Sequence, residues 1–148
     1  MKSSPFQIIN AAAGSGKTYA LVFDYLKKLL STHHDDGYRR MLALTFTNKA
    51  VNEMKFRILY NLYLLAHHIE KDKIRDIRSS LLEDLKIDLP SLQQKAQRIL
   101  NKILHEYAAF EVITLDRFTH KIIKSFAKDL KIPASFEVTL DSDLLLQE

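Results

Sequence analysis

Cysteine and tryptophan are absent from the 148 residues of this chain, and glycine and proline occur only three times each. The absence of cysteine excludes disulfide bonds, thiolate catalysis and zinc sites with cysteine ligands. Glycine and proline together normally supply about 12% of residues, so their scarcity argues against long irregular loops and favours helix. Because 47% of the residues are hydrophobic and 27% are charged, the composition is typical of a globular domain rather than a disordered chain.

Long apolar runs are also missing from the sequence. No segment approaches the roughly 18 apolar residues that a membrane-spanning helix requires. The first five residues, Met-Lys-Ser-Ser-Pro, lack the apolar stretch of a signal peptide. We therefore expect a cytoplasmic protein that has no membrane partner. The net charge of +4 is compatible with a polyanionic partner but is too small to establish one.

The hydrophobic pattern predicts an α/β chain in which short strands alternate with amphipathic helices. Apolar, β-branched runs predict strands at 6–10, 41–46 and 110–115. Apolar residues at helical spacing predict helices at 18–30, after Thr47, at 74–85, at 91–107 and at 117–130. Ser91 and Gln94 predict a capping box at the start of the helix 91–107. The order strand, helix, strand is typical of a parallel β-α-β unit.

A phosphate-binding loop is predicted where the first strand meets the first helix. Residues 11–18 read Ala-Ala-Ala-Gly-Ser-Gly-Lys-Thr and hold two of the three glycines. Glycines let backbone N–H groups turn toward phosphate oxygens, and the helix N-terminus adds its positive dipole end. Lys17 would reach the outer phosphates, and the Thr18 hydroxyl would bind Mg²⁺. The predicted nucleotide site consists of Ala13, Gly14, Ser15, Gly16, Lys17 and Thr18. The alternative is a strand-to-helix turn with an incidental lysine.

Ala11 stands where the general Walker A motif has its first glycine, and this form of the loop resembles motif I of UvrD/Rep/RecB-type superfamily 1 DNA helicases. Residues 44–50, Leu-Thr-Phe-Thr-Asn-Lys-Ala, followed by Glu-Met-Lys at 53–55, resemble motif Ia of that family. Residues 113–118, Ile-Thr-Leu-Asp-Arg-Phe, are similar to its next motif, Thr-x-His-x-Phe, with Asp116 at the position of the usual histidine. The resemblance covers residues 6–127. The short N-terminus and the helical segment between the last two of these motifs favour the RecB/AddA-like branch.

This resemblance implies a fold and a domain organisation. The fold would be a P-loop NTPase (RecA-like) parallel sheet that is rich in helix and incomplete. Residues 1–130 would form the N-terminal part of motor domain 1A, with a helical segment at about 66–107. Residues 131–148 would lead into a 1B subdomain that is absent from this sequence.

The resemblance also implies a function. The chain would be the ATP-binding, Mg²⁺-dependent N-terminal segment of a DNA helicase or helicase-nuclease. Such a motor couples ATP hydrolysis to 3′-to-5′ translocation on single-stranded DNA, in DNA repair or recombination. The implied partners are single-stranded DNA, ATP, the remaining helicase polypeptide, and a nuclease subunit or domain. A non-catalytic module that binds nucleotide and DNA, or a small P-loop kinase, are the alternatives.

The predicted DNA-contacting residues lie at the ends of the second and third strands. The carboxyl ends of strands in an open α/β sheet are where ligands bind. By the resemblance, the DNA-contacting residues are Thr45, Phe46, Thr47, Asn48, Thr114 and Arg117. Phe46 would stack on a base, but a strand-end phenylalanine can equally lie in the core.

The helix 117–130 carries a basic stripe and an apolar face. Its cations Arg117, Lys121, Lys124 and Lys128 recur at helical spacing, and we expect them opposite Phe118, Ile122 and Phe126. Such a stripe can follow the phosphates of a nucleic acid, although a solvated helix face has the same pattern.

Asp116 has two interpretations. An apolar strand that ends in aspartate is also the pattern of a Walker B element, in which the aspartate binds Mg²⁺. In that element a glutamate that activates water follows the aspartate, whereas Arg117 follows Asp116 here. We therefore favour the assignment of Asp116 to the motif Thr-x-His-x-Phe, which is motif Ib of the family. The Asp-Glu pair, the sensing glutamine and the arginines of a second domain do not occur in the 148 residues. We expect no DNA-stimulated ATPase activity from this chain alone.

Overall fold

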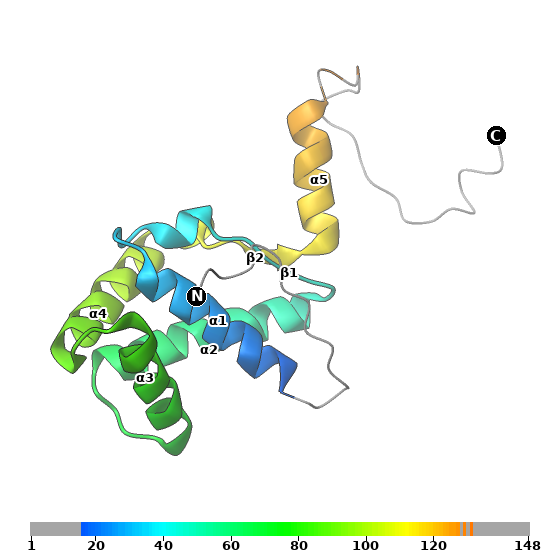
Figure 1. Ribbon diagram of the computed structural model, residues 1–148. Coiled ribbons are helices and arrows are strands. Elements are labelled where there is room, and N and C mark those ends of the chain that lie inside the picture. The colour runs from blue at the N-terminus through cyan, green and yellow to red at the C-terminus, as the bar shows by residue number, and fades with distance from the viewer. Residues whose placement is uncertain (1–15, 128, 130, 132–148) are drawn as a thin grey trace.

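A computed structural model describes residues 16–127 together with residues 129 and 131. Helices dominate this part of the chain (Figure 1). The α-helices are α1 (Lys17–Ser31), α2 (Asn48–Ala66), α3 (Asp72–Leu85), α4 (Leu89–His105) and α5 (Leu115–Phe126). Two short 3-10 helices, η1 (Gly37–Arg40) and η2 (Tyr107–Ala109), precede the strands β1 (Ala43–Thr45) and β2 (Val112–Thr114). No helix among the described residues is long and apolar enough to cross a membrane.

Strands β1 and β2 pair in parallel, with Ala43 opposite Val112 and Thr45 opposite Thr114. The chain between them forms α2, α3 and α4, so the connection is a long helical crossover. This arrangement confirms a helix-rich α/β chain with parallel strand pairing. The strand predicted at 6–10 and the segment 132–148 lie outside the described residues, so the RecA-like sheet and the domain boundaries remain predictions.

The described helices lie close to their predicted positions, with local differences at their ends. Helix α4 begins at Leu89, two residues before the predicted start, because Asp88 is its N-cap. A carboxylate oxygen of Asp88 accepts a hydrogen bond from the Ser91 backbone N–H at 3.1 Å. The capping box predicted at Ser91 and Gln94 is therefore wrong, since Ser91 already lies in the first turn. Helix α5 ends at Phe126, short of the predicted residue 130.

The core lies between helices α1 to α4 and one side of the strand pair. Helix α2 passes through the middle of this body and packs against α4, α1 and β2. The fully buried side chains include Leu26, Leu29, Ile58, Leu62, Leu81 and Leu92. Apolar stripes on four helices thus meet in one continuous cluster, and their burial is the main contribution that stabilises the body.

The turn η1 attaches the body to the first strand. A side chain in place of Gly37 would put a Cβ atom only 2.7 Å from the Thr32 hydroxyl oxygen, so this close approach requires glycine. The next residue, Tyr38, is fully buried, and its hydroxyl donates to a carboxylate oxygen of Glu106 at 3.0 Å. These contacts hold the entry to β1 against the end of α4.

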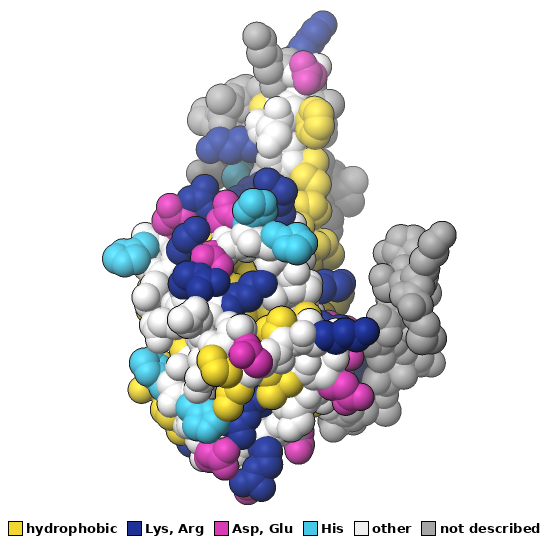
Figure 2. Space-filling model, turned by 60° about the vertical axis from the view of Figure 1, so that its left-hand side comes forward, with side chains coloured by type: hydrophobic (Ala, Val, Ile, Leu, Met, Phe, Trp, Pro, Cys, Tyr) yellow, Lys and Arg dark blue, Asp and Glu magenta, His cyan; other side chains and the backbone are white. Residues whose placement is uncertain are grey.

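Helix α5 stands away from this body (Figure 1) and has no buried residue among its twelve described positions. Its apolar residues Leu115, Ile122 and Phe126 are exposed, and hydrophobic side chains gather along this part of the surface in Figure 2. The sequence predicted that Lys121 lies opposite the apolar face of this helix, and this prediction is wrong. Its ammonium pairs with Glu111 at 2.6 Å, because Glu111 precedes β2 and faces the same side of α5. Lys128 lies outside the described residues.

Candidate nucleotide and nucleic-acid sites

The start of α1 carries the described part of the predicted phosphate loop. Gly16 is the N-cap residue and has φ 81°, a left-handed backbone conformation that glycine adopts without strain. The first turn of α1 contains no acidic residue, and its leading N–H groups have no acceptor inside the helix. Lys17 and Thr18 are both exposed at this end. The geometry at residues 16–18 therefore suits an anion, whereas Ala13, Gly14 and Ser15 lie outside the described residues.

The parallel register brings the two predicted DNA-contacting segments together. Thr45 and Thr114 are direct partners in the ladder, and each strand leads straight into a helix at the same edge of the pair. Thr47 caps α2 by accepting a hydrogen bond from the Ala50 N–H at 3.1 Å. Thr114 caps α5 in the same way, through the Arg117 N–H at 3.3 Å. Two helix N-termini with threonine caps thus lie side by side.

Phe46 is 84% exposed, so the alternative that placed this ring in the core is wrong. The ring follows β1 directly and precedes the cap of α2. The Thr45 hydroxyl donates to the Thr47 carbonyl at 3.2 Å, which orders the turn on which Phe46 lies. Asn48, in the first turn of α2, is also exposed. An exposed aromatic ring between hydroxyl and amide groups is a surface on which a nucleic-acid base can stack.

Arg117 and Asp116 lie in the first turn of α5, beyond the end of β2. Both side chains are exposed. Among the described residues, no three histidine or acidic side chains are grouped so that they could hold a metal ion. Thr18 as the Mg²⁺ ligand and Asp116 as a residue of the motif after β2 both stay predictions from the sequence.

The sequence indicated no role for Lys55, although this residue lies in the segment that resembles motif Ia. Its ammonium lies over the ring of Tyr107 in η2, 4.6 Å from the centroid. Burial, and after it the positive charge of Arg117, hold the pKa of Lys55 below its ordinary value, while Glu111 opposes the shift. A lysine two turns after a helix cap has no recognisable signal in sequence, because only the crossover brings it near β2.

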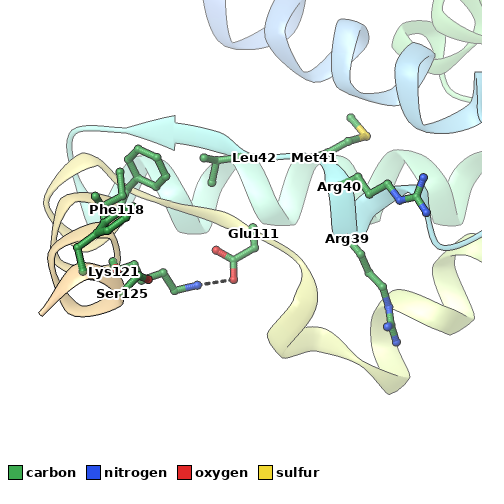
Figure 3. A pocket seen from close by; sticks show the side chains of 10 residues that line it. Arg39, Arg40, Met41, Leu42, Glu111, Phe118, Lys121 and Ser125 are labelled. Carbon is green, nitrogen blue, oxygen red and sulfur yellow. Dashed lines mark hydrogen bonds and ion pairs between the residues drawn. The ribbon is translucent and has the colours of Figure 1, made fainter. Parts of the chain in front are cut away.

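The structure also contains a groove that sequence analysis did not predict. Its open volume is about 400 Å³, and it lies between α5 and the chain that enters β1. Phe118 and Leu42 face each other across it, above the Glu111–Lys121 ion pair (Figure 3). No predicted nucleotide-binding or DNA-contacting residue lines this groove.

Comparisons with known proteins identify relatives along nearly the whole chain. Residues 3–147 match the family model described as UvrD/REP helicase N-terminal domain. The A subunit of the ATP-dependent helicase/nuclease from Natranaerobius thermophilus is 30% identical over 139 residues, which are 94% of this chain and 9% of that protein. The protein of the same name from Bacillus cytotoxicus is 30% identical over 145 residues, which are 95% of this chain and 10% of that protein.

The chain therefore spans about a tenth of the length of the curated relatives that it matches. No solved structure matches it. The family match points away from a small P-loop kinase, which was one of the alternatives from the sequence.

Proposed function

Because this chain belongs to the UvrD/REP helicase N-terminal domain family, we propose that it is the ATP-binding N-terminal segment of a DNA helicase or helicase-nuclease motor. In this proposal, hydrolysis of ATP drives 3′-to-5′ translocation on single-stranded DNA during DNA repair or recombination. The motor acts in the cytoplasm, together with the remaining helicase polypeptide and a nuclease subunit or domain. Residues 1–130 belong to motor domain 1A, and residues 131–148 lead toward 1B.

The nucleotide part of the proposal rests on the turn before α1. The left-handed Gly16 directs the chain into a helix whose first turn has no acidic side chain. We assign the phosphates of ATP to this end, with Lys17 near the outer phosphates and the Thr18 hydroxyl as a Mg²⁺ ligand. Ala13, Gly14 and Ser15 complete the loop in the proposal.

The DNA part of the proposal is carried by one observation, the pairing of Thr45 with Thr114. This register places two capped helix N-termini beside the exposed ring of Phe46. Backbone N–H groups and hydroxyls at helix N-termini are frequent phosphate contacts, and they carry no sequence preference. We assign a single strand to this edge, with Phe46 stacked on a base and Thr47, Asn48 and Arg117 near phosphates.

Nucleotide binding is tested with the Lys17→Ala variant. We expect Mg-ATP affinity to fall at least about tenfold, or about 1.4 kcal/mol, because a cation near the phosphates is lost. Lys28→Ala is the matched control, since Lys28 is an exposed cation at the other end of the same helix. Titration calorimetry gives both affinities. Equal affinity for the Lys17 variant and the parent protein would remove the phosphate-loop assignment.

DNA binding is tested with Phe46→Ala and an oligo(dT) strand in fluorescence anisotropy. We expect a loss of about 1 to 3 kcal/mol with an unchanged salt dependence, because stacking releases no counterions. Phe126→Ala is the control, since this ring is also exposed but lies on α5, away from the strand ends. A Phe46 variant that binds like the parent would contradict the assignment of the strand to this edge.

A further inference from the structure

The groove between α5 and the chain that enters β1 exposes several large apolar side chains. Leu42, Ile122 and Phe126 line it and are 46%, 42% and 54% exposed. Phe118 faces Leu42 across the opening (Figure 3). Apolar side chains gathered around an open volume of about 400 Å³ are typical of a surface that another segment covers.

The charged residues that line this groove are mostly cations. Arg39 and Arg40 come from η1, and Lys121 comes from α5. Arg39 pairs with Glu106, and Lys121 pairs with Glu111 at 2.6 Å. Arg40 is exposed and has no ion pair at 4.0 Å or closer within residues 16–127. The groove therefore suits an occupant that combines apolar with acidic side chains.

The sequence contains such a segment shortly after α5. Residues 132–148 contain four acidic residues and no cation, although the whole chain has 22 lysine and arginine residues. Within them, residues 136–141 read Phe-Glu-Val-Thr-Leu-Asp, so apolar residues alternate with polar ones. This alternation is typical of an extended segment with one apolar face and one polar face, which is acidic here. We call residues 136–141 the acidic segment.

The groove and the apolar face of the acidic segment are of similar length. Phe118 and Phe126 are eight residues apart on α5, which is about 12 Å along the helix axis. An extended chain would place Phe136 and Leu140 about 13 Å apart. The connection is long enough, because the ten residues from Phe126 to Phe136 can span up to about 33 Å. Lys131 has φ 55°, a left-handed conformation that does not continue a helix.

We propose that this groove is the docking site for the acidic segment of the same chain. Phe136, Val138 and Leu140 occupy the groove, and the acidic face lies toward Arg40 at the rim. The same chain is favoured over a second copy, because a short connection gives the segment a high effective concentration. Docking covers the apolar face of α5 and holds this helix beside the entry to β1. The inference requires neither nucleotide nor DNA, so it stands apart from the proposed function.

The experiment measures how fast a bulky maleimide reagent modifies one thiol in the 148-residue chain. The chain has no cysteine, so each engineered thiol is unique. Ser125→Cys places a thiol in the groove. Ser80→Cys is the matched control, because Ser80 is exposed on α3, which lies away from α5 (Figure 1).

Each thiol is measured with the parent segment and with the triple variant Phe136→Ser, Val138→Ser and Leu140→Ser. We expect the triple variant to raise the rate at position 125 at least about fivefold, because a covered thiol reacts only in the open fraction of molecules. The rate at position 80 should stay the same. A fivefold ratio corresponds to about 1 kcal/mol, so this local docking does not register in the global unfolding of the body.

The charge part of the inference is tested with Arg40→Glu in the chain that carries Ser125→Cys. We expect this reversal to raise the rate at position 125 about two- to fivefold, within the range of an exposed ion pair. Adding Glu137→Lys and Asp141→Lys should restore the slower rate, since the two charges are then exchanged. An unchanged rate for Arg40→Glu would overturn the pairing with Arg40.

Two further outcomes would overturn the docking itself. If the triple variant and the parent segment give the same rate at position 125, the acidic segment does not cover the groove. If the protection at position 125 is lost when the protein is diluted, a second copy is the occupant, and light scattering would then detect a dimer. Circular dichroism and the rate at position 80 confirm that each variant keeps the fold of the body.

Discussion

The helical body and helix α5 are built from similar amphipathic sequence but differ in what they bury. Each of α1, α2 and α4 contributes at least five buried residues to the body, and α5 contributes none. The stripe of α5 is as clearly apolar as the others, yet Ile122 and Phe126 are exposed. Amphipathic spacing therefore predicts where a helix forms, but it does not identify the surface against which the helix packs.

The two threonine caps at the candidate DNA-binding edge show the same contrast. Thr47 caps a helix that passes through the core, whereas Thr114 caps the helix that stands away from it. The residues near Thr47 are therefore held on a helix that is packed into the core. Contacts from α5 depend on a helix that has few tertiary contacts among the described residues, and local opening is easier there.

The largest effect on stability is expected when a buried aliphatic side chain is truncated. Ile58→Ala should lower the free energy of unfolding by about 2 to 5 kcal/mol, because Ile58 is fully buried in α2 and leaves a cavity. The matched change Ile122→Ala in α5 should cost less than about 1 kcal/mol. Urea denaturation followed by circular dichroism measures both. A large loss for Ile122 would mean that α5 is packed in solution.

A smaller effect is expected from removing the two threonine caps. Thr47→Ala should lower the free energy of unfolding of the body by about 1 kcal/mol, since α2 unfolds together with the core. Thr114→Ala should leave that global value nearly unchanged and instead raise hydrogen exchange in α5. Amide exchange measured by mass spectrometry resolves the two helices. Similar global losses for both variants would show that α5 and the body unfold as one unit.

The smallest effect concerns a polar atom inside the body. The Tyr25 hydroxyl is buried and has no hydrogen-bond partner in the part of the chain that the structure describes. Tyr25→Phe should leave stability unchanged or raise it by up to about 1 kcal/mol, because an unsatisfied group is removed and the ring stays. In Tyr38→Phe the lost hydroxyl donates to Glu106, so stability should fall by about 1 kcal/mol. Thermal melts compare the pair, and a destabilised Tyr25 variant would reveal a partner for its hydroxyl.

Much of the local structure could be predicted from the sequence because it depends on neighbouring residues. The sequence predicts a helix after Thr47, and the structure shows this residue as the cap of α2. The start of α4 differs from the prediction because Ser91 and Asp88 are both good caps, and only the observed hydrogen bond distinguishes them. The exposure of Phe46 could not be predicted, since a ring at a strand end packs inward or outward according to what covers the sheet.

The family, the helix-rich α/β class and the approximate positions of the described helices follow from the amino-acid sequence, because motifs and periodicity are local properties of the chain. The tertiary structure decided which distant residues meet. The crossover through α2, α3 and α4 aligns Thr45 with Thr114, and it brings the Lys55 ammonium over the ring of Tyr107. It also decided that α5 stands apart, since burial depends on how helices and strands pack together rather than on the pattern of any one helix.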